Sequence, residues 1–399
     1  MADLLRLEEA QARLLALGAP LAREEVAIGE ADGRWLAEDV AALVAQPPCD
    51  VSAMDGWAVR AADGADPRHV VGVSAAGAGF RGTIGRGETV RIFTGAPVPT
   101  GADAVVLQED AALEGEWVRI VAVDAVTPGR HIRRAGQDFR ANDTLARAGQ
   151  QLSPARIGLL AAGGHGRLGV RRAPRVAVLA TGSELVPPGV VPKPPRIVSS
   201  NGAMIAALAR RAGARVSDHG IVADDRHATR RALAAAAGGA DVLVTIGGAS
   251  VSAHDLVRPA LADLGGRLDF WRIAIRPGKP LLAGRLGDAI VLGLPGNPVS
   301  AFVCALLLLC PLLRHLAGAA DPMPKERRGR AGAAVEANGA RRAFLRARLD
   351  EQSGEPLVTP APVQDSAMLS VLAASDVLLI RPEHAPALSR GAEVAFLTY

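Results

Sequence analysis

Between Arg175 and about Ala317, strand-like and helix-like segments alternate, and few folds are compatible with this order. Short apolar runs, such as RVAVLATG, DVLVTIGG and AIVLGLPGNP, are separated by segments of helical spacing, such as SSNGAMIAALARRAG and DDRHATRRALAAAAGG. Such alternation is typical of a parallel sheet covered by helices on both faces. We therefore predict a doubly wound α/β domain over residues 173–317.

The predicted strands of this region end in glycines, acids or rigid turns. These ends are Thr181-Gly182, Asp224-Asp225, Gly247-Gly248 and the turn Pro295-Gly296-Asn297-Pro298. In open α/β sheets the carboxyl ends of the strands line the ligand crevice. The four ends together indicate a binding site, although ordinary turns between strands and helices are an alternative.

The last of these turns belongs to the stretch LGLPGNPVSAF, which allows two interpretations. In the simpler one, Asn297 is the N-cap and Pro298 the first residue of a helix. In the other, the turn is a backbone cradle for an anion at a helix N-terminus. The stretch by itself does not decide between them.

The rest of the chain divides into three further regions. Residues 46–146 are rich in Gly, Val and Pro with short strand-like pieces, which predicts an inserted β-rich domain. Helix-like text flanks it in residues 1–45 and 147–172, which predicts a discontinuous helical scaffold domain. After the linker DPMPKERRGR, residues 322–399 read as a small C-terminal β-barrel.

Composition excludes several classes of protein. The chain has 399 residues, which predicts several domains, and only three cysteines, which favours a reduced, cytoplasmic protein without disulfides or thiolate metal sites. Aromatic residues are 3%, too few for stacking on nucleic acid despite a net charge of +4. The N-terminus lacks a secretory signal pattern. The run AFVCALLLLCPLLRHL is shorter than a membrane span and contains Pro311, so we expect a buried helix and no membrane contact.

Carboxylates follow the predicted strands at Glu184, Asp224, Asp225 and Asp255. Acids beside a phosphate site require a cation between them and the substrate, and oxygen ligands suit Mg²⁺. Capping of helices is the alternative role of Asp224 and Asp255. The loop IRPGKP places Arg276 and Lys279 three residues apart, where they would clamp an oxyanion or stand on an exposed turn.

Taken together, ten strings resemble one family, the molybdopterin molybdenumtransferases, which comprise bacterial MoeA proteins and the C-terminal domain of gephyrin. They occur in family order from about residue 5 to 399 and are SAMDGWAV, RIFTGAPVPTGADAVV, RRAGQDF, LATGSEL, SSNGAMIAAL, DDRHATRRAL, WRIAIRPGKP, GLPGNPVSAF, FLRARL and QDSAMLSVLAASDVLLIRP. The resemblance implies an elongated homodimer of four-domain protomers. It also implies that adenylated molybdopterin and molybdate react, with Mg²⁺, to give molybdenum cofactor and AMP.

The resemblance also implies roles for individual residues. Asp224 and Asp255 would hold the metal, with Glu184 beside them, and Asp55, Thr94 and Asp138 would come from the β-rich domain of the other subunit. The molybdate pocket would consist of Arg276, Lys279, Pro280, Arg346 and Ser366. The pterin and its phosphate would contact Thr181, Gly182, Ser200, Gly247, Gly248, Ser250, Pro295, Gly296, Asn297 and Pro298. Expected partners are molybdopterin adenylyltransferase and molybdoenzyme maturation proteins.

Two departures from the family pattern bear on the site. Ser252 and Ala253 replace a glycine and an acid that commonly precede Asp255, and Arg272 and Arg276 replace family lysines. Arginine keeps the charge but is planar and bidentate, so the geometry of oxyanion binding changes.

Two other functions are alternatives. One is a molybdopterin adenylyltransferase, which would resemble residues 173–317 only. The other is a degenerate scaffold that binds molybdopterin or a partner protein without catalysis.

Overall fold

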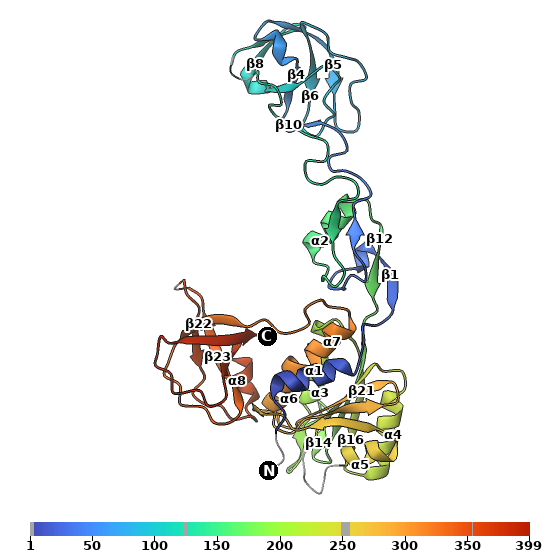
Figure 1. The fold of residues 1–399 in the computed structure, drawn as a ribbon, viewed down its shortest axis with the longest axis vertical. Helices are drawn as coiled ribbons and strands as arrows, with labels where there is room; N and C mark the ends of the chain where they lie inside the picture. Colours follow the sequence, from blue (N-terminus) through green and yellow to red (C-terminus); the bar gives the residue numbers. More distant parts are fainter. Residues whose placement is uncertain (1–3, 123, 125, 249–255, 353) are drawn as a thin grey trace.

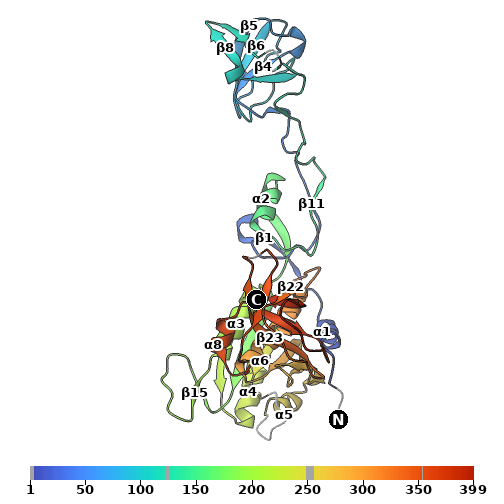
Figure 2. The same cartoon turned by 90° about the vertical axis from the view of Figure 1, so that its left-hand side faces the viewer.

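The computed structural model describes residues 4–122, 124, 126–248, 256–352 and 354–399. The molecule is elongated (Figure 1). A β-rich domain stands at one end of the long axis on a narrow stalk, and the α/β domain and the C-terminal domain lie together at the other end (Figures 1 and 2).

A six-stranded sheet forms the centre of the α/β domain, in the order β16-β13-β17-β21-β20-β18. The first four strands are parallel to one another, and β20 runs antiparallel to both of its neighbours, β21 and β18. Residues of β17 and β21 are buried without alternation, as expected for strands covered on both faces. The strands are β13 (Arg175–Thr181), β16 (Arg215–Val222), β17 (Val242–Ile246), β18 (Arg267–Trp271), β20 (Leu282–Leu286) and β21 (Ala289–Leu294).

Helices cover both faces of this sheet. One core combines the sheet with α3, α6 and α7, and a second core on the other face combines it with α4 and α5. The helices are α3 (Asn201–Arg211), α4 (Arg226–Ala237), α5 (Val257–Asp263), α6 (Pro298–Cys304) and α7 (Cys310–Leu316). The predicted doubly wound architecture is confirmed.

The apolar run after the Pro-Gly-Asn-Pro turn forms one 19-residue helix, Pro298–Leu316, and 89% of its most apolar 18-residue stretch is buried. It is long and apolar enough to cross a membrane, so the expectation that it is shorter than a span is wrong. Pro311 does not end it, because the π-helical segment η5 (Ala305–Leu309) precedes the proline and widens the turn that holds the ring. A helix that is apolar on all sides must be buried on all sides, and here the sheet, α1, α3 and the C-terminal domain surround it.

The N-terminal helix differs from the expected scaffold position. α1 (Leu7–Ala16) buries Leu7, Ala10 and Leu14 in the core of the α/β domain, and Gln11 Nε2 donates to Leu307 O at 2.8 Å. Its apolar stripe packs there because the apolar helix has a flank that the sheet does not cover. The scaffold itself is only partly helical: β1 (Arg23–Ala27) pairs with β12 (Arg167–Arg171), β2 (Val40–Ala41) pairs with β11 (Thr144–Ala146), and α2 (Pro154–Ala162) packs on them.

The β-rich domain is a six-stranded sheet in the order β7-β4-β6-β5-β9-β8. Separate apolar clusters form on its two faces. The strands are β4 (Gly56–Val59), β5 (Arg68–Ser74), β6 (Glu88–Ile92), β7 (Ala104–Leu107), β8 (Ala111–Glu114) and β9 (Trp117–Ile120), with the short pair β3 (Val51–Ser52) and β10 (Ile132–Arg133) beside them.

The C-terminal domain is a closed barrel. Its strands β23-β24-β22-β26-β25 pair in sequence, and β25 pairs back to β23. The strands are β22 (Arg327–Ala331), β23 (Arg342–Asp350), β24 (Leu357–Pro360), β25 (Val377–Arg381) and β26 (Glu393–Thr398), and α8 (Leu369–Ala373) lies on the chain before β25. β19 (Ile275–Arg276) extends from the α/β domain and pairs with β23, so it fixes Arg276 against the barrel.

Asp241 precedes β17 and binds the segment that connects β12 of the scaffold domain to β13 of the sheet. Its carboxylate accepts hydrogen bonds at 2.9 Å from both Nη atoms of Arg172 and at 2.7 Å from the backbone N–H of Arg175. Burial acts to raise the pKa of this carboxyl, but the hydrogen bonds outweigh burial and lower the pKa from 3.8 to about 2.

We predict that Asp241→Asn lowers the free energy of unfolding at pH 7 by about 2 kcal/mol. A group whose pKa is lowered by folding stabilises the protein above its unfolded-state pKa, and the contribution is lost as pH falls from 3.8 towards 2. Urea unfolding of both proteins at neutral and acid pH tests this. The difference between them should shrink at acid pH, and a constant difference would contradict the role of the charge.

Candidate active site

A crevice with a volume of about 620 Å³ opens at the carboxyl ends of β13, β16, β17 and β21. The strand order reverses at β13: the connection through α3 runs from β13 to β16 on one side, and the connection through α4 returns from β16 to β17 on the other side. The helices α3 and α4 therefore cover opposite faces, and a crevice is expected at this point. The crevice is lined by many of the residues expected from the sequence, namely Thr181, Gly182, Glu184, Ser200, Asp224, Gly247, Gly248, Pro280, Pro295, Gly296, Asn297 and Pro298.

Two glycines bring bare backbone to the crevice wall. Gly247 and Gly248 have φ angles of 88° and 62°. A Cβ on Gly247 would lie 2.7 Å from the carbonyl oxygen of Thr181, and one on Gly248 would lie 2.6 Å from Cγ2 of Val257. Both the backbone conformation and the space therefore require glycine here.

The Pro-Gly-Asn-Pro turn starts a helix, as the simpler interpretation of its sequence predicts, and the anion cradle stays a prediction. Asn297 is the N-cap residue of α6 and Pro298 stands in the first helical turn, as in an ordinary helix start. The Asn297 side chain, however, makes no capping bond, and its Nδ2 donates instead to Ser366 Oγ at 3.0 Å. The turn therefore begins a helix and also joins the crevice wall to the C-terminal domain.

Asn201, which the sequence analysis missed, connects two walls of the crevice. Its Nδ2 donates to the carbonyl oxygen of Gly296 at 2.6 Å. Its Oδ1 is buried and has no hydrogen-bond partner among the described residues. A buried acceptor at the edge of a cavity suits an N–H or O–H group of a ligand. The signal lies in the string SSNGAMIAAL, but a Ser-Asn pair before an apolar helical segment is equally typical of a helix start.

Asp224 lines the crevice through a reciprocal contact with Ser183. The Ser183 N–H donates to Asp224 Oδ2 at 3.0 Å, and the Asp224 N–H donates to Ser183 Oγ at 2.9 Å. The cap of α4 is the next residue, Asp225, whose Oδ1 accepts from the Ala228 N–H at 2.7 Å. The capping alternative is thus satisfied by Asp225, which leaves the Asp224 carboxylate at the crevice.

Glu184 and Asp224 are two oxygen-donor side chains on one cavity, the chemistry that Mg²⁺ prefers. Asp255 and Ser250, and the replacements at Ser252 and Ala253, lie outside the described residues. Within the described part of the chain, no group of three or more His, Cys, Asp or Glu side chains is placed to hold a metal ion.

A second cavity of about 560 Å³, the arginine cavity, lies at the junction with the barrel. Arg276, Arg346, Gln364 and Arg381 are among the residues that line it. The loop 361–368 borders both cavities, because Gln364 lines the arginine cavity and Ala367 lines the crevice. An anion in one cavity and a ligand in the crevice would therefore share this loop.

Arg346 is fully buried in the wall of the arginine cavity. Its Nη2 donates to the carbonyl oxygens of Val363 and Asp365 at 3.2 and 3.0 Å, and its Nε has no partner among the described residues. Burial lowers the pKa of this guanidinium. The bonds to the two carbonyl oxygens compensate part of the cost of burying this cation. Three arginines and one carboxylate, Glu336, line the cavity, so it keeps a positive charge that suits an oxyanion.

The five residues expected to form one molybdate pocket do not all meet. Arg276 and Arg346 share the arginine cavity, whereas Pro280 lines the crevice and Ser366 contacts its wall through Asn297. Lys279 is exposed on the loop and is not among the lining residues of either cavity. The backbone explains the separation, because β19 directs Arg276 to the barrel while the chain turns back at Gly278.

The β-rich domain carries the remaining predicted residues. The backbone N–H and Oγ1 of Thr94 donate to Asp55 Oδ1 at 2.7 and 2.8 Å, and these bonds lower the pKa of Asp55. Asp138 is exposed on the loop after β10, where its N–H donates to Gln46 O at 3.0 Å. This domain and the α/β domain, which carries the crevice, lie at opposite ends of the molecule (Figure 2).

Comparison with known proteins agrees with this architecture along the chain. Three family profiles match in order: "MoeA N-terminal region (domain I and II)" over residues 5–164, "Probable molybdopterin binding domain" over 177–315 and "MoeA C-terminal region (domain IV)" over 328–399. The molybdopterin molybdenumtransferase 2 of Mycobacterium tuberculosis is 38% identical over 381 residues, or 92% of this chain and 93% of that protein. The chain belongs to the molybdopterin molybdenumtransferase family.

Other members of the molybdopterin molybdenumtransferase family give the same result. The Haemophilus influenzae enzyme is 36% identical over 321 residues, or 79% of this chain and 78% of that protein. A crystal structure of the Pyrococcus horikoshii MoeA protein superposes with a TM-score of 0.86 at 27% identity and covers all of both chains. Matches of this length contradict the adenylyltransferase reading, which would involve residues 173–317 only.

Proposed function

We propose that this protein transfers molybdenum from molybdate to adenylated molybdopterin, releases AMP and so forms molybdenum cofactor. The chain is a transferase of molybdenum cofactor biosynthesis, as its relatives over nearly the whole length are named. The proposal rests on the loop 361–368, which borders both the crevice and the arginine cavity. This shared loop supports placing the pterin phosphate in the crevice and molybdate in the arginine cavity. A phosphate ester in the first would lie beside an oxyanion in the second.

In this proposal the crevice binds the pterin and its phosphates. The backbone at Gly247 and Gly248 and the turn at Asn297 form the wall, and Asn201 Oδ1 accepts a ligand N–H. Asp224 and Glu184, with Asp255, would hold Mg²⁺, which when bound neutralises charge on the phosphate bridge. Ser183 orients Asp224 through Oδ2, so Oδ1 would be available to the cation. Two carboxylates suffice, because Mg²⁺ commonly keeps water and phosphate oxygens as its other ligands.

Molybdate-dependent release of AMP tests the reaction. Purified protein is mixed with adenylated molybdopterin and Mg²⁺, and AMP is measured by chromatography with and without molybdate. We expect AMP to appear only when molybdate is present. Binding of the pterin without molybdate-dependent AMP release would instead support the scaffold reading.

We propose that the active form is a homodimer in which the β-rich domain of one copy covers the crevice of the other. The β-rich domain, which carries Asp55, Thr94 and Asp138, lies at the opposite end of the molecule from the α/β domain of its own chain (Figure 1). Only another copy can bring them to it, because the stalk holds the domain away from the rest of the chain.

A stable dimer is therefore expected in sedimentation velocity at micromolar concentration. Activity per chain should fall on dilution below the dissociation constant of the dimer, because each site loses the carboxylate of Asp55. A chain that sediments as a monomer and keeps full activity would contradict the proposal.

We propose a cytoplasmic location and two kinds of partner. An enzyme that adenylates molybdopterin must supply the substrate, and a maturation protein must accept the finished cofactor, because both compounds carry reactive groups. Co-purification of the chain with each partner, with and without pterin substrate, tests these contacts.

A further inference from the structure

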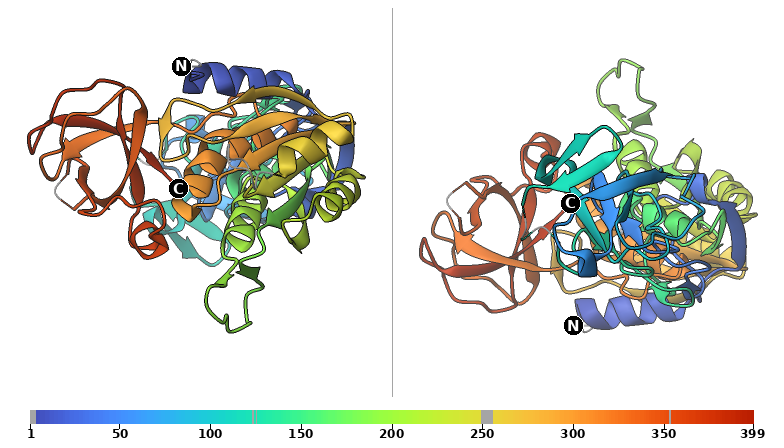
Figure 3. Two further views of the ribbon diagram at one scale, coloured as in Figure 1. Left: turned by 90° about the horizontal axis from the view of Figure 1, so that it is seen from below. Right: turned by 90° about the horizontal axis from the view of Figure 1, so that it is seen from above.

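The α/β domain carries a projecting arm, residues 185–198, whose base is the pair β14 (Leu185–Val186) and β15 (Ile197–Val198). It extends from the body of the domain in Figures 2 and 3. Val191 at its tip is 89% exposed and Val190 is 48% exposed. Five of its fourteen residues are proline, so the arm is stiff and loses little entropy when it docks.

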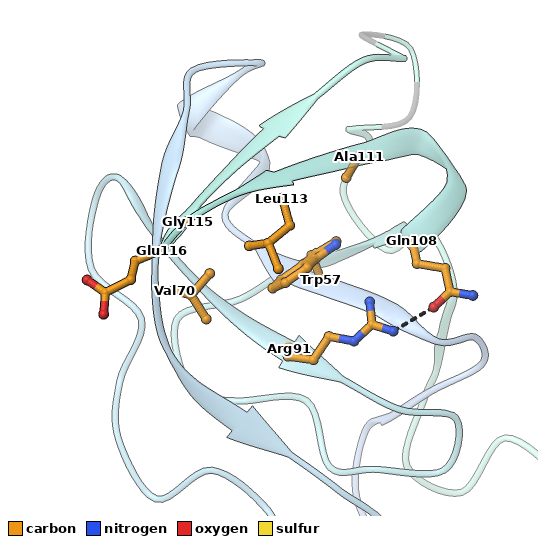
Figure 4. Close-up of a pocket in the computed structure, with 8 residues that line it drawn as sticks. All are labelled: Trp57, Val70, Arg91, Gln108, Ala111, Leu113, Gly115 and Glu116. Atoms are coloured by element: carbon orange, nitrogen blue, oxygen red, sulfur yellow. Dashed lines mark hydrogen bonds between the residues drawn. The ribbon is translucent and has the colours of Figure 1, made fainter.

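The β-rich domain has a recess of about 630 Å³ on one face of its sheet (Figure 4). Trp57, Val70, Ala111 and Leu113 give it an apolar lining, and Leu113 is 57% exposed. An apolar lining and an exposed leucine in one concave surface are typical of a docking site.

The recess adjoins the Asp55–Thr94 pair through Arg91 and Gln108. The Arg91 guanidinium lies 5.1 Å from the centre of the Trp57 ring, and its Nη2 donates to Gln108 Oε1 at 2.5 Å. The Gln108 N–H in turn donates to the carbonyl oxygen of Asp55 at 3.2 Å. Whatever fills the recess therefore lies beside the residues that we propose to complete the partner's site.

The arm adjoins the other half of that site. Leu185, Ile197 and Val198 line the crevice, and the Ile197 N–H donates to the carbonyl oxygen of Glu184 at 2.8 Å. Lys193 and Arg196 are exposed on the arm, and the charged residues that line the recess are Glu116 and Arg91, of which Arg91 is already bonded to Gln108. The apolar tip therefore suits the apolar lining, and Glu116 suits the cations beside the tip.

We infer that the tip of the arm, Val190–Val191, docks into the recess of a second copy of this chain. The contact cannot form within one chain, because the arm and the β-rich domain that carries the recess lie toward opposite ends of the molecule (Figures 1 and 2). In a two-fold pair it forms twice and closes the assembly. The arm is too small for a stable interface alone, so this inference rests on the homodimer of the proposed function and specifies how each crevice is flanked.

Disulfide trapping tests the contact. Val191→Cys and Leu113→Cys are combined with Cys49→Ser, because Cys49 is exposed while Cys304 and Cys310 are buried. A disulfide forms only when the two Cβ atoms come within about 4.5 Å. We expect mild oxidation to give covalent dimers on a non-reducing gel, with the linked peptides identified by mass spectrometry. The matched control is Val191→Cys with Val73→Cys, since Val73 is 55% exposed in the same domain and does not line the recess.

Three outcomes separate the inference from the proposed function. The docking is supported if Val191→Cys forms much more disulfide-linked dimer with Leu113→Cys than with Val73→Cys. It is also supported if Val191→Asp raises the dissociation constant of the dimer about tenfold or more. If the protein sediments as a dimer but the two cysteine pairs give equal amounts of disulfide, or none, the docking is wrong and the proposed function stands. A monomer that releases AMP on addition of molybdate overturns both the docking and the dimer.

Discussion

Asp224→Asn is expected to lower the rate of AMP release by a factor of roughly 10² to 10⁴, which corresponds to the several kcal/mol of charge stabilisation that a bound metal ion supplies. The amide keeps the shape of the side chain and its contact with the Ser183 N–H, but it removes the charge that would hold Mg²⁺ at the phosphate bridge. Binding of adenylated molybdopterin should persist, because it rests on the backbone at Gly247, Gly248 and the Pro-Gly-Asn-Pro turn. Single-turnover AMP release and a separate binding titration measure the two effects.

The neighbouring residue gives a matched control. Asp225→Asn makes the same chemical change one position later, and asparagine is an equally good N-cap for α4. This variant should keep its activity and its fold. Equal activity of the two variants and the unchanged protein would remove Asp224 from the mechanism, and equal losses would point to the fold of the segment instead.

Arg346→Met is expected to weaken molybdate binding by about ten- to a hundredfold, which corresponds to about 1.5–3 kcal/mol for a charged hydrogen bond. The guanidinium is fully buried in the wall of the arginine cavity and donates to the carbonyl oxygens of Val363 and Asp365. Molybdate should raise the thermal unfolding temperature of the unchanged protein, because a ligand stabilises the state that binds it. This rise should disappear in the variant, and it requires no catalytic activity.

Arg348→Met is the control for this change. Arg348 stands on the same strand, β23, but is exposed and donates to the carbonyl oxygen of Ala374. Its loss removes one positive charge without altering the arginine cavity, so molybdate should still stabilise the variant. If both variants lose the response, general charge attraction explains the binding, and if neither does, Arg346 has only a structural role. Lys279→Ala tests the clamp predicted from the sequence, because Lys279 is exposed on the same loop as Arg276. Loss of stabilisation by molybdate in this variant would show that the clamp needs both cations.

The sequence predicted the α/β domain well because the information is local. Continuous apolar runs such as AIVLGL can be buried only between two layers of helices, and Gly or Pro at their ends stops each strand. The crevice follows, since parallel strands must place their carboxyl ends at one edge of a sheet. Thr181, Asp224, Gly247 and Asn297 are spread over more than a hundred residues, yet this rule alone predicts that they meet.

Helix boundaries and helix partners were predicted less well. The stripe of Leu7, Ala10 and Leu14 indicates a packed helix, but no local pattern says which core receives it. Likewise Pro311 reads as a break, and only the preceding π-helical segment makes it compatible with a continuous helix. The position of the first helix depends on residues distant in the chain. The second feature depends on a local backbone geometry that the pattern of apolar residues does not reveal.

What the sequence by itself determined is the order of the domains, the family and the crevice of the α/β domain, because each rests on spacing within short segments. What only the tertiary structure decided is how side chains from different segments are held. β19 joins the barrel and takes Arg276 to Arg346, whereas Lys279, three residues later, stays exposed. Asp225 caps a helix, so the adjacent Asp224 is left for the crevice, with Ser183 to orient it. Hydrogen bonds and burial between distant segments set these positions, and spacing along the chain does not encode them.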